Sequence, residues 1–206
     1  MKIIQQFFPD LSSLQIQQFI ALKKLYENWN EKINVISRKD MENFYTHHIL
    51  HSLSIARVFQ FQTNQTVMDL GTGGGFPGLP LAIFFPEIKF HLVDSINKKL
   101  KVAENIASQI NLPNVNVQHT RAENIKDKKF DIVISRAVAP LKDLWEWSKP
   151  LLSGSADVEM VTGLICLKGG ELEKEISESG TRPAIYEIEK IFPLPYFTEK
   201  YILHVT

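Results

Sequence analysis

Hydrophobic and polar positions along the chain follow two different periods, one before and one after about residue 60. From Leu14 to Trp29 the apolar residues recur at helical spacing behind three capping candidates, and a second amphipathic stretch covers residues 41–59. Asp40 immediately precedes that stretch and is predicted to be its N-cap. The first 60 residues are therefore predicted to be helical.

From Thr66 onward, short apolar runs alternate with helical segments. The runs expected as strands are 67–70, 88–93, 115–118, 130–135 and 164–167, and the helices fall near 78–85, 96–110, 141–152 and 170–178. Residues 184–192 and 200–205 are expected as two further strands in a hairpin at the sheet edge, and 153–161 as a surface loop.

This alternation predicts a doubly wound α/β fold of the Rossmann-like type. Its sheet is expected to be mostly parallel with an antiparallel C-terminal edge. We expect an N-terminal helical extension over residues 1–62, packed on the core, and a ligand-binding domain over residues 63–206.

A glycine-rich turn, Asp69 to Gly78, follows the first predicted strand. Glycine permits positive φ and lets a ligand approach the main chain, and nucleotide-like ligands bind at the carboxyl end of such a strand. Phe76 stands where a dinucleotide fingerprint needs its third glycine, and no Gly-Lys pair of a phosphate-binding loop is present. Asp69 suits a ligand with an amino group and a cationic sulfonium better than a pyrophosphate. The run resembles motif I of the class I S-adenosylmethionine (SAM) methyltransferases.

Two later strand ends supply further candidate contacts. Asp94 ends the second strand, where a carboxylate can accept both ribose hydroxyls of an adenosine; alternatively, it caps the following helix. Thr120 to Glu123 follow the third strand, and in a methyltransferase fold this loop borders the adenine.

The fourth strand runs into Ser135, Arg136 and Ala137, without the [DNS]-P-P-[YFW] motif of methyltransferases that act on exocyclic amines. The single cysteine, Cys166, lies in an apolar run and is expected to be inert packing, and no metal site is expected. Guanine N7 has an in-plane lone pair and needs no base, so it fits a site without these groups. Arg136 is then expected to orient the reactants; the alternative is a surface arginine paired with Asp131 or Asp143.

The chain resembles the RsmG (GidB) family, SAM-dependent methyltransferases of guanine N7 in 16S ribosomal RNA. The resemblance rests on the run from Asp69 through Gly-Phe-Pro-Gly to Ile83, and on shorter motifs along nearly the whole chain. It implies SAM contacts at five positions: Gly71, Phe76, Ala122, Glu123 and Arg136. The glycine loop and the end of the second strand add Gly73 and Asp94 to this set. In one departure, the usual H-x-x-D-S carries His51 in place of its aspartate.

Charge is balanced in total but not along the chain. The chain has 23 basic and 23 acidic residues, but residues 1–149 carry a net charge of +4 and residues 150–206 a net charge of −4. The acidic part is expected to face away from RNA. Phosphate contacts are expected from the basic part, at four candidate positions: Arg38, Lys98, Lys99 and Arg121.

The expected partner is 16S ribosomal RNA within a small-subunit ribosomal particle, which presents the guanine unstacked. No signal peptide or membrane span is visible, so a cytoplasmic protein without membrane contact is expected. Three alternatives stay open: a non-catalytic RNA- or ribosome-binding module of the same fold, a small-molecule methyltransferase and, least favoured, an NAD enzyme.

Overall fold

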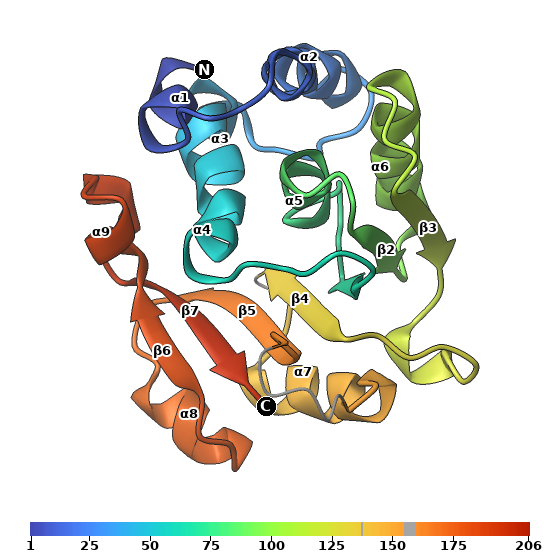
Figure 1. The fold of residues 1–206 in the computed structure, drawn as a ribbon, viewed down its shortest axis with the longest axis vertical. Coiled ribbons are helices and arrows are strands. Elements are labelled where there is room, and N and C mark those ends of the chain that lie inside the picture. Colours follow the sequence, from blue (N-terminus) through green and yellow to red (C-terminus); the bar gives the residue numbers. More distant parts are fainter. Residues whose placement is uncertain (137, 155–159) are drawn as a thin grey trace.

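The computed structural model describes residues 1–136, 138–154 and 160–206, with Arg38 described for its backbone only. Its centre is a sheet in the order β3-β2-β1-β4-β5-β7-β6 (Figure 1). Strands β1 to β5 are parallel, and β7 runs antiparallel to both β5 and β6. The strands are β1 (Thr66–Leu70), β2 (Lys89–Asp94), β3 (Val115–His119), β4 (Ile132–Arg136), β5 (Gly163–Gly169), β6 (Ala184–Glu187) and β7 (Lys200–Val205).

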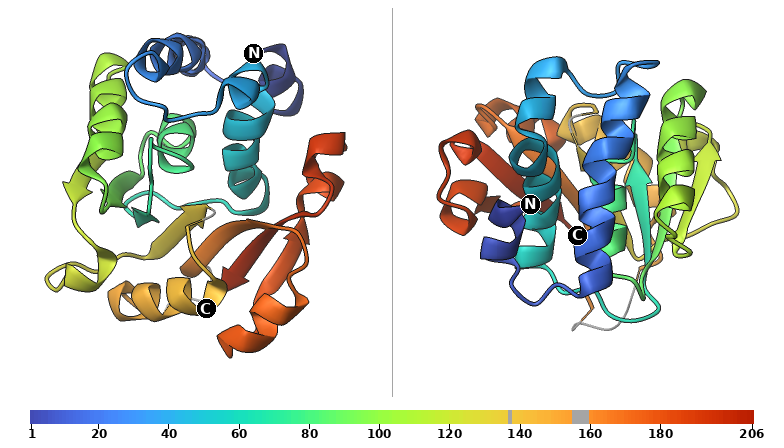
Figure 2. Two further views of the ribbon diagram at one scale, coloured as in Figure 1. Left: turned by 180° about the vertical axis from the view of Figure 1, so that it is seen from behind. Right: turned by 90° about the horizontal axis from the view of Figure 1, so that it is seen from above.

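Helices cover both faces of the sheet. One face carries the N-terminal helices together with α5 and α6, and α4, α2 and α6 lie side by side in the view from above (Figure 2). The helices of this layer are α1 (Lys2–Phe7), α2 (Ser13–Asn30), α3 (Arg38–Glu42), the π-helical turn η1 (Tyr45–Leu50), α4 (His51–Val58), α5 (Gly78–Phe84) and α6 (Asn97–Gln109). The opposite face carries α7 (Leu141–Ser148) and α8 (Glu173–Ser179), which contact each other. Shorter turns are η2 (Ala122–Asn124), η3 (Lys149–Leu151), α9 (Ile188–Ile191) and η4 (Pro195–Phe197).

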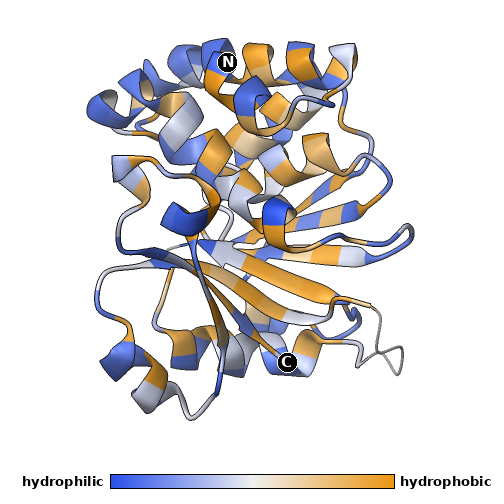
Figure 3. Cartoon of the chain, turned by 60° about the vertical axis from the view of Figure 1, so that its left-hand side comes forward, coloured by the Kyte–Doolittle hydropathy of each residue, from blue (hydrophilic) through white to orange (hydrophobic). Residues whose placement is uncertain are grey.

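The main hydrophobic core joins the N-terminal helices to the sheet without a break. Fully buried side chains of the lead-in, such as Phe19, Leu22 and Leu53, belong to the same cluster as Val67 and Leu92 in the central strands. Figure 3 shows this as apolar strands between helices whose outer sides are hydrophilic. Since burial of apolar surface drives folding, the position of α2 and α4 over the sheet follows from their apolar faces.

The predicted fold class is confirmed, while two local predictions were wrong. The helix after residue 37 begins with α3, and its N-cap is Ser37 rather than Asp40, because the Ser37 hydroxyl accepts a hydrogen bond from the Asp40 amide at 3.1 Å. The strand expected over residues 184–192 is also shorter, since β6 ends at Glu187 and α9 follows directly. Of the expected surface loop 153–161, residues 155–159 lie outside the described residues.

None of the helices in the described parts of the chain combines the length and the apolar character that crossing a bilayer requires.

Candidate active site

A cleft of about 410 Å³ opens at the carboxyl ends of β1, β2 and β4, bounded by the loop after β3. This volume lies in the range of small-molecule sites, ~300–1,000 Å³. All seven positions expected to contact SAM line it, among other residues: Gly71, Gly73, Phe76, Asp94, Ala122, Glu123 and Arg136. Residues separated by 65 positions in the chain thus meet at one edge of the sheet, as the parallel strand order requires.

The backbone of the glycine loop is fixed against β2 and open toward the cleft. The amides of Gly71 and Thr72 both donate to the Val93 carbonyl, at 2.9 and 3.0 Å. Gly71 has φ +70°, and a Cβ there would lie 2.6 Å from Val138. Gly73 has φ +57°, but a Cβ there would meet no atom within 4 Å. The loop therefore needs glycine at both positions for its conformation, and only at Gly73 is there free space for a ligand.

Asp69 lies beneath the loop and is not one of the residues that line the cleft. It is fully buried, and one carboxylate oxygen accepts hydrogen bonds from the Thr72 hydroxyl at 2.7 Å and the Gly78 amide at 2.8 Å. Its other oxygen is buried without a hydrogen-bond partner among the described residues. Asp69 therefore holds the two ends of the loop together.

Burial raises the pKa of Asp69 to about 7. Because the folded pKa is higher than that of the unfolded chain, the native state binds this proton more tightly, and the stability that it contributes is present at low pH. That stability is lost as the pH rises through the folded pKa. Between the unfolded pKa and the folded pKa, the free energy of unfolding falls by roughly 1.4 kcal/mol per pH unit. We expect Asp69→Asn to remove this slope between about pH 5 and about pH 7, measured by urea unfolding of both proteins. Equal slopes in the variant and the unmodified protein would show that Asp69 does not titrate there.

Asp94 presents an oriented carboxylate to the cleft. It is 8% exposed, and its two oxygens accept hydrogen bonds from the amides of Gly73 and Ile96, each at 2.7 Å. It does not cap α6, since the N-cap position there is Ile96. An ionised carboxylate has about four lone-pair directions, so two stay available for hydroxyl donors.

Arg136 is half-buried at the edge of the cleft and has no carboxylate within 4.0 Å among the described residues. Its guanidinium lies 4.9 Å from the centre of the Phe76 ring and donates to His48 Nδ1 at 3.2 Å and to the His47 carbonyl at 3.4 Å. The alternative pairing with Asp131 or Asp143 was wrong: Asp131 accepts from the Thr66 amide at 2.7 Å instead. An unpaired cation at the edge of a cleft is free to act on a ligand.

His48 is a lining residue whose place in the cleft was not predicted. Burial and the nearby Arg136 lower its pKa to about 3, so the ring is neutral at pH 7 and its Nδ1 accepts from Arg136. The proton is therefore on Nε2, which is buried without a hydrogen-bond partner in the described structure. Such an unused donor beside a cleft is a candidate ligand contact.

Further lining residues come from the segment after α2, from the loop after β4 and from α7, and no local pattern in the sequence predicted them. They are Val35, Ile36, Val138 and Trp147. Behind them, Tyr26 donates to the Gly74 carbonyl at 2.6 Å and stacks on Phe76 at 4.9 Å between ring centroids. The helix α2 thus supports the loop from the side opposite the cleft.

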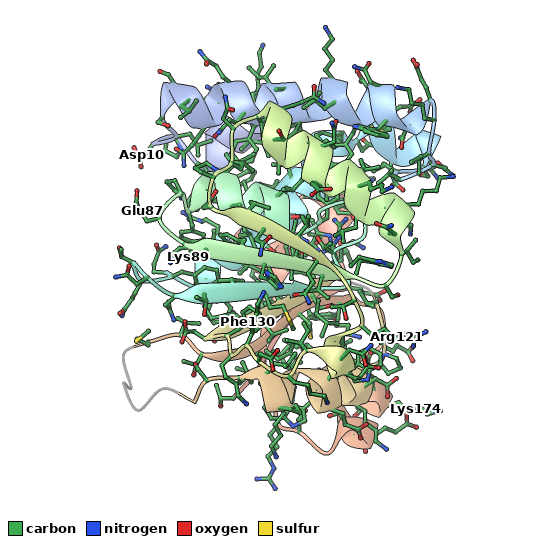
Figure 4. The ribbon with its side chains drawn as sticks, turned by 90° about the vertical axis from the view of Figure 1, so that its right-hand side faces the viewer. Asp10, Glu87, Lys89, Arg121, Phe130 and Lys174 are labelled. Carbon is green, nitrogen blue, oxygen red and sulfur yellow. The ribbon has the colours of Figure 1, made fainter. Side chains whose placement is uncertain are left out.

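The four basic residues expected to contact RNA differ in their position relative to the cleft. Lys99 and Arg121 line the cleft, and Lys98 is exposed in the same turn of α6. Arg38 begins α3, and its side chain lies outside what the structure describes. Figure 4 shows Arg121 at one end of the molecule and Lys89 at the other.

Cys166, expected to be inert packing, is fully buried in the core beneath α7, and burial raises the pKa of its thiol to about 12. Within the described residues, no group of three or more histidine, cysteine or acidic side chains is arranged to hold a metal ion.

The strand order, the antiparallel β7 and a glycine-lined cleft at the carboxyl strand ends define a class I SAM-dependent methyltransferase fold. A solved SAM-dependent methyltransferase from Aquifex aeolicus matches with a TM-score of 0.57 at 17% identity, over 82% of this chain and 98% of that one.

Sequence comparison gives the family. A family model described as rRNA small subunit methyltransferase G (GidB) matches residues 15–199. A ribosomal RNA small subunit methyltransferase G from Bacteroides thetaiotaomicron is 54% identical over 99% of this chain and 98% of its own length. One of that name from Bacteroides fragilis is 52% identical over the full length of both. The chain belongs to the rRNA small subunit methyltransferase G family, which confirms the resemblance drawn from the glycine loop.

Proposed function

We propose that this protein transfers a methyl group from SAM to N7 of a specific guanosine in 16S ribosomal RNA. The observation that carries the proposal is the cleft at the carboxyl ends of the parallel strands, where the glycine loop, Asp94 and the unpaired Arg136 meet in a chain of this family. The seven lining positions that were expected to contact SAM are proposed as its binding residues.

The cleft fits SAM by the chemistry of its walls. Asp94 offers free acceptor positions for ribose hydroxyls, and His48 offers an unused Nε2–H donor for a carboxylate. Gly73 leaves open space at the centre of the loop, so that a ligand can lie against the main chain. Ala122 and Glu123 in η2 form the wall after β3, where we place the adenine.

SAM supplies a methyl group on a positively charged sulfonium sulfur. The N7 lone pair of the guanine forms the new C–N bond while the S–C bond breaks, and its electron pair stays on sulfur. No proton has to leave N7, so the reaction needs no general base, and the cleft holds a neutral His48 beside the cationic Arg136. The chain's own contribution is then to position two reactants, which is worth up to about 7–11 kcal/mol of a barrier.

The proposal extends to the context of the reaction. We propose that the substrate is RNA within a small-subunit ribosomal particle in the cytoplasm, because the modest charge of the chain gives weak attraction to naked RNA. The division into a helical extension, 1–62, and a SAM-binding domain, 63–206, also stays a prediction.

The proposal is tested by transfer of labelled methyl groups from SAM to small-subunit particles and to their extracted RNA. Transfer to the particle is the expected result. SAM binding without transfer to either substrate would contradict it, and tight binding of NADH instead of SAM in parallel calorimetric titrations would exclude the SAM cleft itself.

Phosphate contact at the mouth of the cleft gives a prediction with a matched control. Arg121→Gln is expected to weaken particle binding several-fold and to lower the slope of log affinity against log salt by about 0.7–0.9, the amount for one lost phosphate contact. Lys89→Gln removes an exposed charge at the opposite end of the molecule (Figure 4) and is expected to change neither quantity. Equal slopes for both variants in a binding titration at several salt concentrations would rule out the RNA contact proposed for Arg121.

A further inference from the structure

A second cavity of about 960 Å³ adjoins the cleft, with Arg136 and Val138 lining both. It lies where β4 and β5 end, at Arg136 and Gly169, and extends toward α8. Figure 4 shows Lys174, which lines this cavity, on the same side of the molecule as Arg121, which lines the cleft. The space beyond Arg136 therefore lies next to the proposed SAM site.

Its walls carry hydrogen-bond acceptors from separate elements. His51 lines the cavity and is only 8% exposed, and its Nε2 has no hydrogen-bond partner in the described structure. Burial and the positive charge of Arg136 hold the pKa of His51 well below its usual value, so the ring is neutral. A hydrogen bond with the backbone of His47 occupies the ring's other nitrogen, which leaves Nε2 as an unused acceptor.

Two carboxylates face the same space. Glu175 accepts hydrogen bonds from the Leu141 amide and from Lys168, and Lys168 also donates to the Ala139 carbonyl, so this ion pair fastens the loop after β4 to α8. Glu171, just after β5, lines the cavity and has no hydrogen bond or ion pair among the described residues. These two residues of the acidic part of the chain therefore line a cavity that adjoins the cleft.

A cation on one side and free acceptors on the other fit the edges of guanine. Its O6 and N7 are acceptors on one edge, while N1–H and the 2-amino group are donors on the Watson–Crick edge. Adenine lacks this arrangement, because its six-position carries a donor. Tyr196 also lines the cavity, with its ring stacked on His47 at 3.7 Å between ring centroids and the Lys200 ammonium 4.6 Å from the ring centroid.

We propose that this second cavity receives the target guanine, with O6 toward Arg136 and the N1–H and 2-amino edge toward the Glu171 carboxylate and His51 Nε2. The inference rests on the proposed function and assigns the base-reading residues of that site. The purine becomes positive as N7 is methylated, and Arg136, itself a cation, does not stabilise that charge. The carboxylate of Glu171 does, so its effect is expected on kcat.

The test compares Glu171→Gln with Glu173→Gln, a control of equal charge change at an exposed residue two positions away that does not line the cavity. Methyl transfer to small-subunit particles is measured with each variant, together with SAM affinity by calorimetry and particle affinity by titration. Glu171→Gln is expected to lower kcat about tenfold or more while both affinities stay near those of the unmodified protein, and Glu173→Gln to change none of them. Glu171→Asp keeps the charge and is expected to recover a large part of kcat.

Equal kcat values for Glu171→Gln and Glu173→Gln would overturn the assignment while the proposed function stands. If the unmodified protein binds SAM but transfers no methyl group, the proposed function fails first, and the assignment fails with it.

Discussion

The Arg136→Ala variant is expected to transfer methyl groups about a hundredfold more slowly than the unmodified protein, the scale of a loss of reactant positioning. Arg136 forms the wall shared by the cleft and the second cavity, so its loss affects both reactants at once. It also removes the donor to His48 Nδ1 and the cation above Phe76. The effect is expected mainly in kcat, with a smaller change in SAM affinity.

Arg136→Lys serves as the control for this variant. It keeps the positive charge but loses the planar fork that reaches His48 and the His47 carbonyl together, so it is expected to recover only part of the rate. Single-turnover kinetics with saturating SAM separate this loss from a loss of binding. An Arg136→Ala variant with the kcat of the unmodified protein would exclude the positioning role.

Gly73→Asp is expected to abolish SAM binding while the fold persists. A Cβ at Gly73 would meet no atom within 4 Å, and Gly73 lines the cleft, so the new side chain is expected to enter the open space there. There it brings a second negative charge close to Asp94, whose carboxylate already accepts the Gly73 amide. The positive φ of +57° adds a folding penalty of about 1 kcal/mol for any residue other than glycine.

Gly180→Asp reproduces that penalty away from the cleft. Gly180 ends α8 with φ +65°, and a Cβ there also meets nothing within 4 Å. The two variants are expected to lose similar stability in thermal unfolding, and calorimetry with SAM is expected to show binding only for Gly180→Asp. Retained SAM affinity in Gly73→Asp would show that the ligand does not lie against this part of the loop.

The sequence predicted the parts of the site that one local pattern encodes. A strand, a glycine turn and a helix follow one another from Thr66 to Phe84, and Asp94 marks the end of the next strand. Because parallel strands align their carboxyl ends, the pattern alone brings Gly71, Asp94 and Arg136 to one edge.

What the sequence did not predict depends on packing between distant segments. Val35 and His48 reach the cleft only because α2 and α4 pack over the sheet through the shared core. The orientation of the Asp69 side chain was also not predictable. Its neighbours in the sequence do not show that its carboxylate accepts hydrogen bonds from Thr72 and Gly78 beneath the loop. Likewise, a total charge does not show where Glu171 and Glu175 lie, and the turn of the chain after β5 brings them to the same cavity as Arg136.

Methyl transfer to N7 of a guanosine leaves 7-methylguanosine in the product, so nucleoside analysis of 16S ribosomal RNA detects the proposed reaction in the cell. The RNA is taken from cells that contain this protein, from cells that lack it and from cells that carry Arg136→Ala, then digested and examined by mass spectrometry. We expect about one 7-methylguanosine per 16S RNA molecule attributable to the unmodified protein, its absence without the protein and a strong decrease with Arg136→Ala. The same amount of 7-methylguanosine in 16S RNA with and without the protein would show that this protein does not methylate N7.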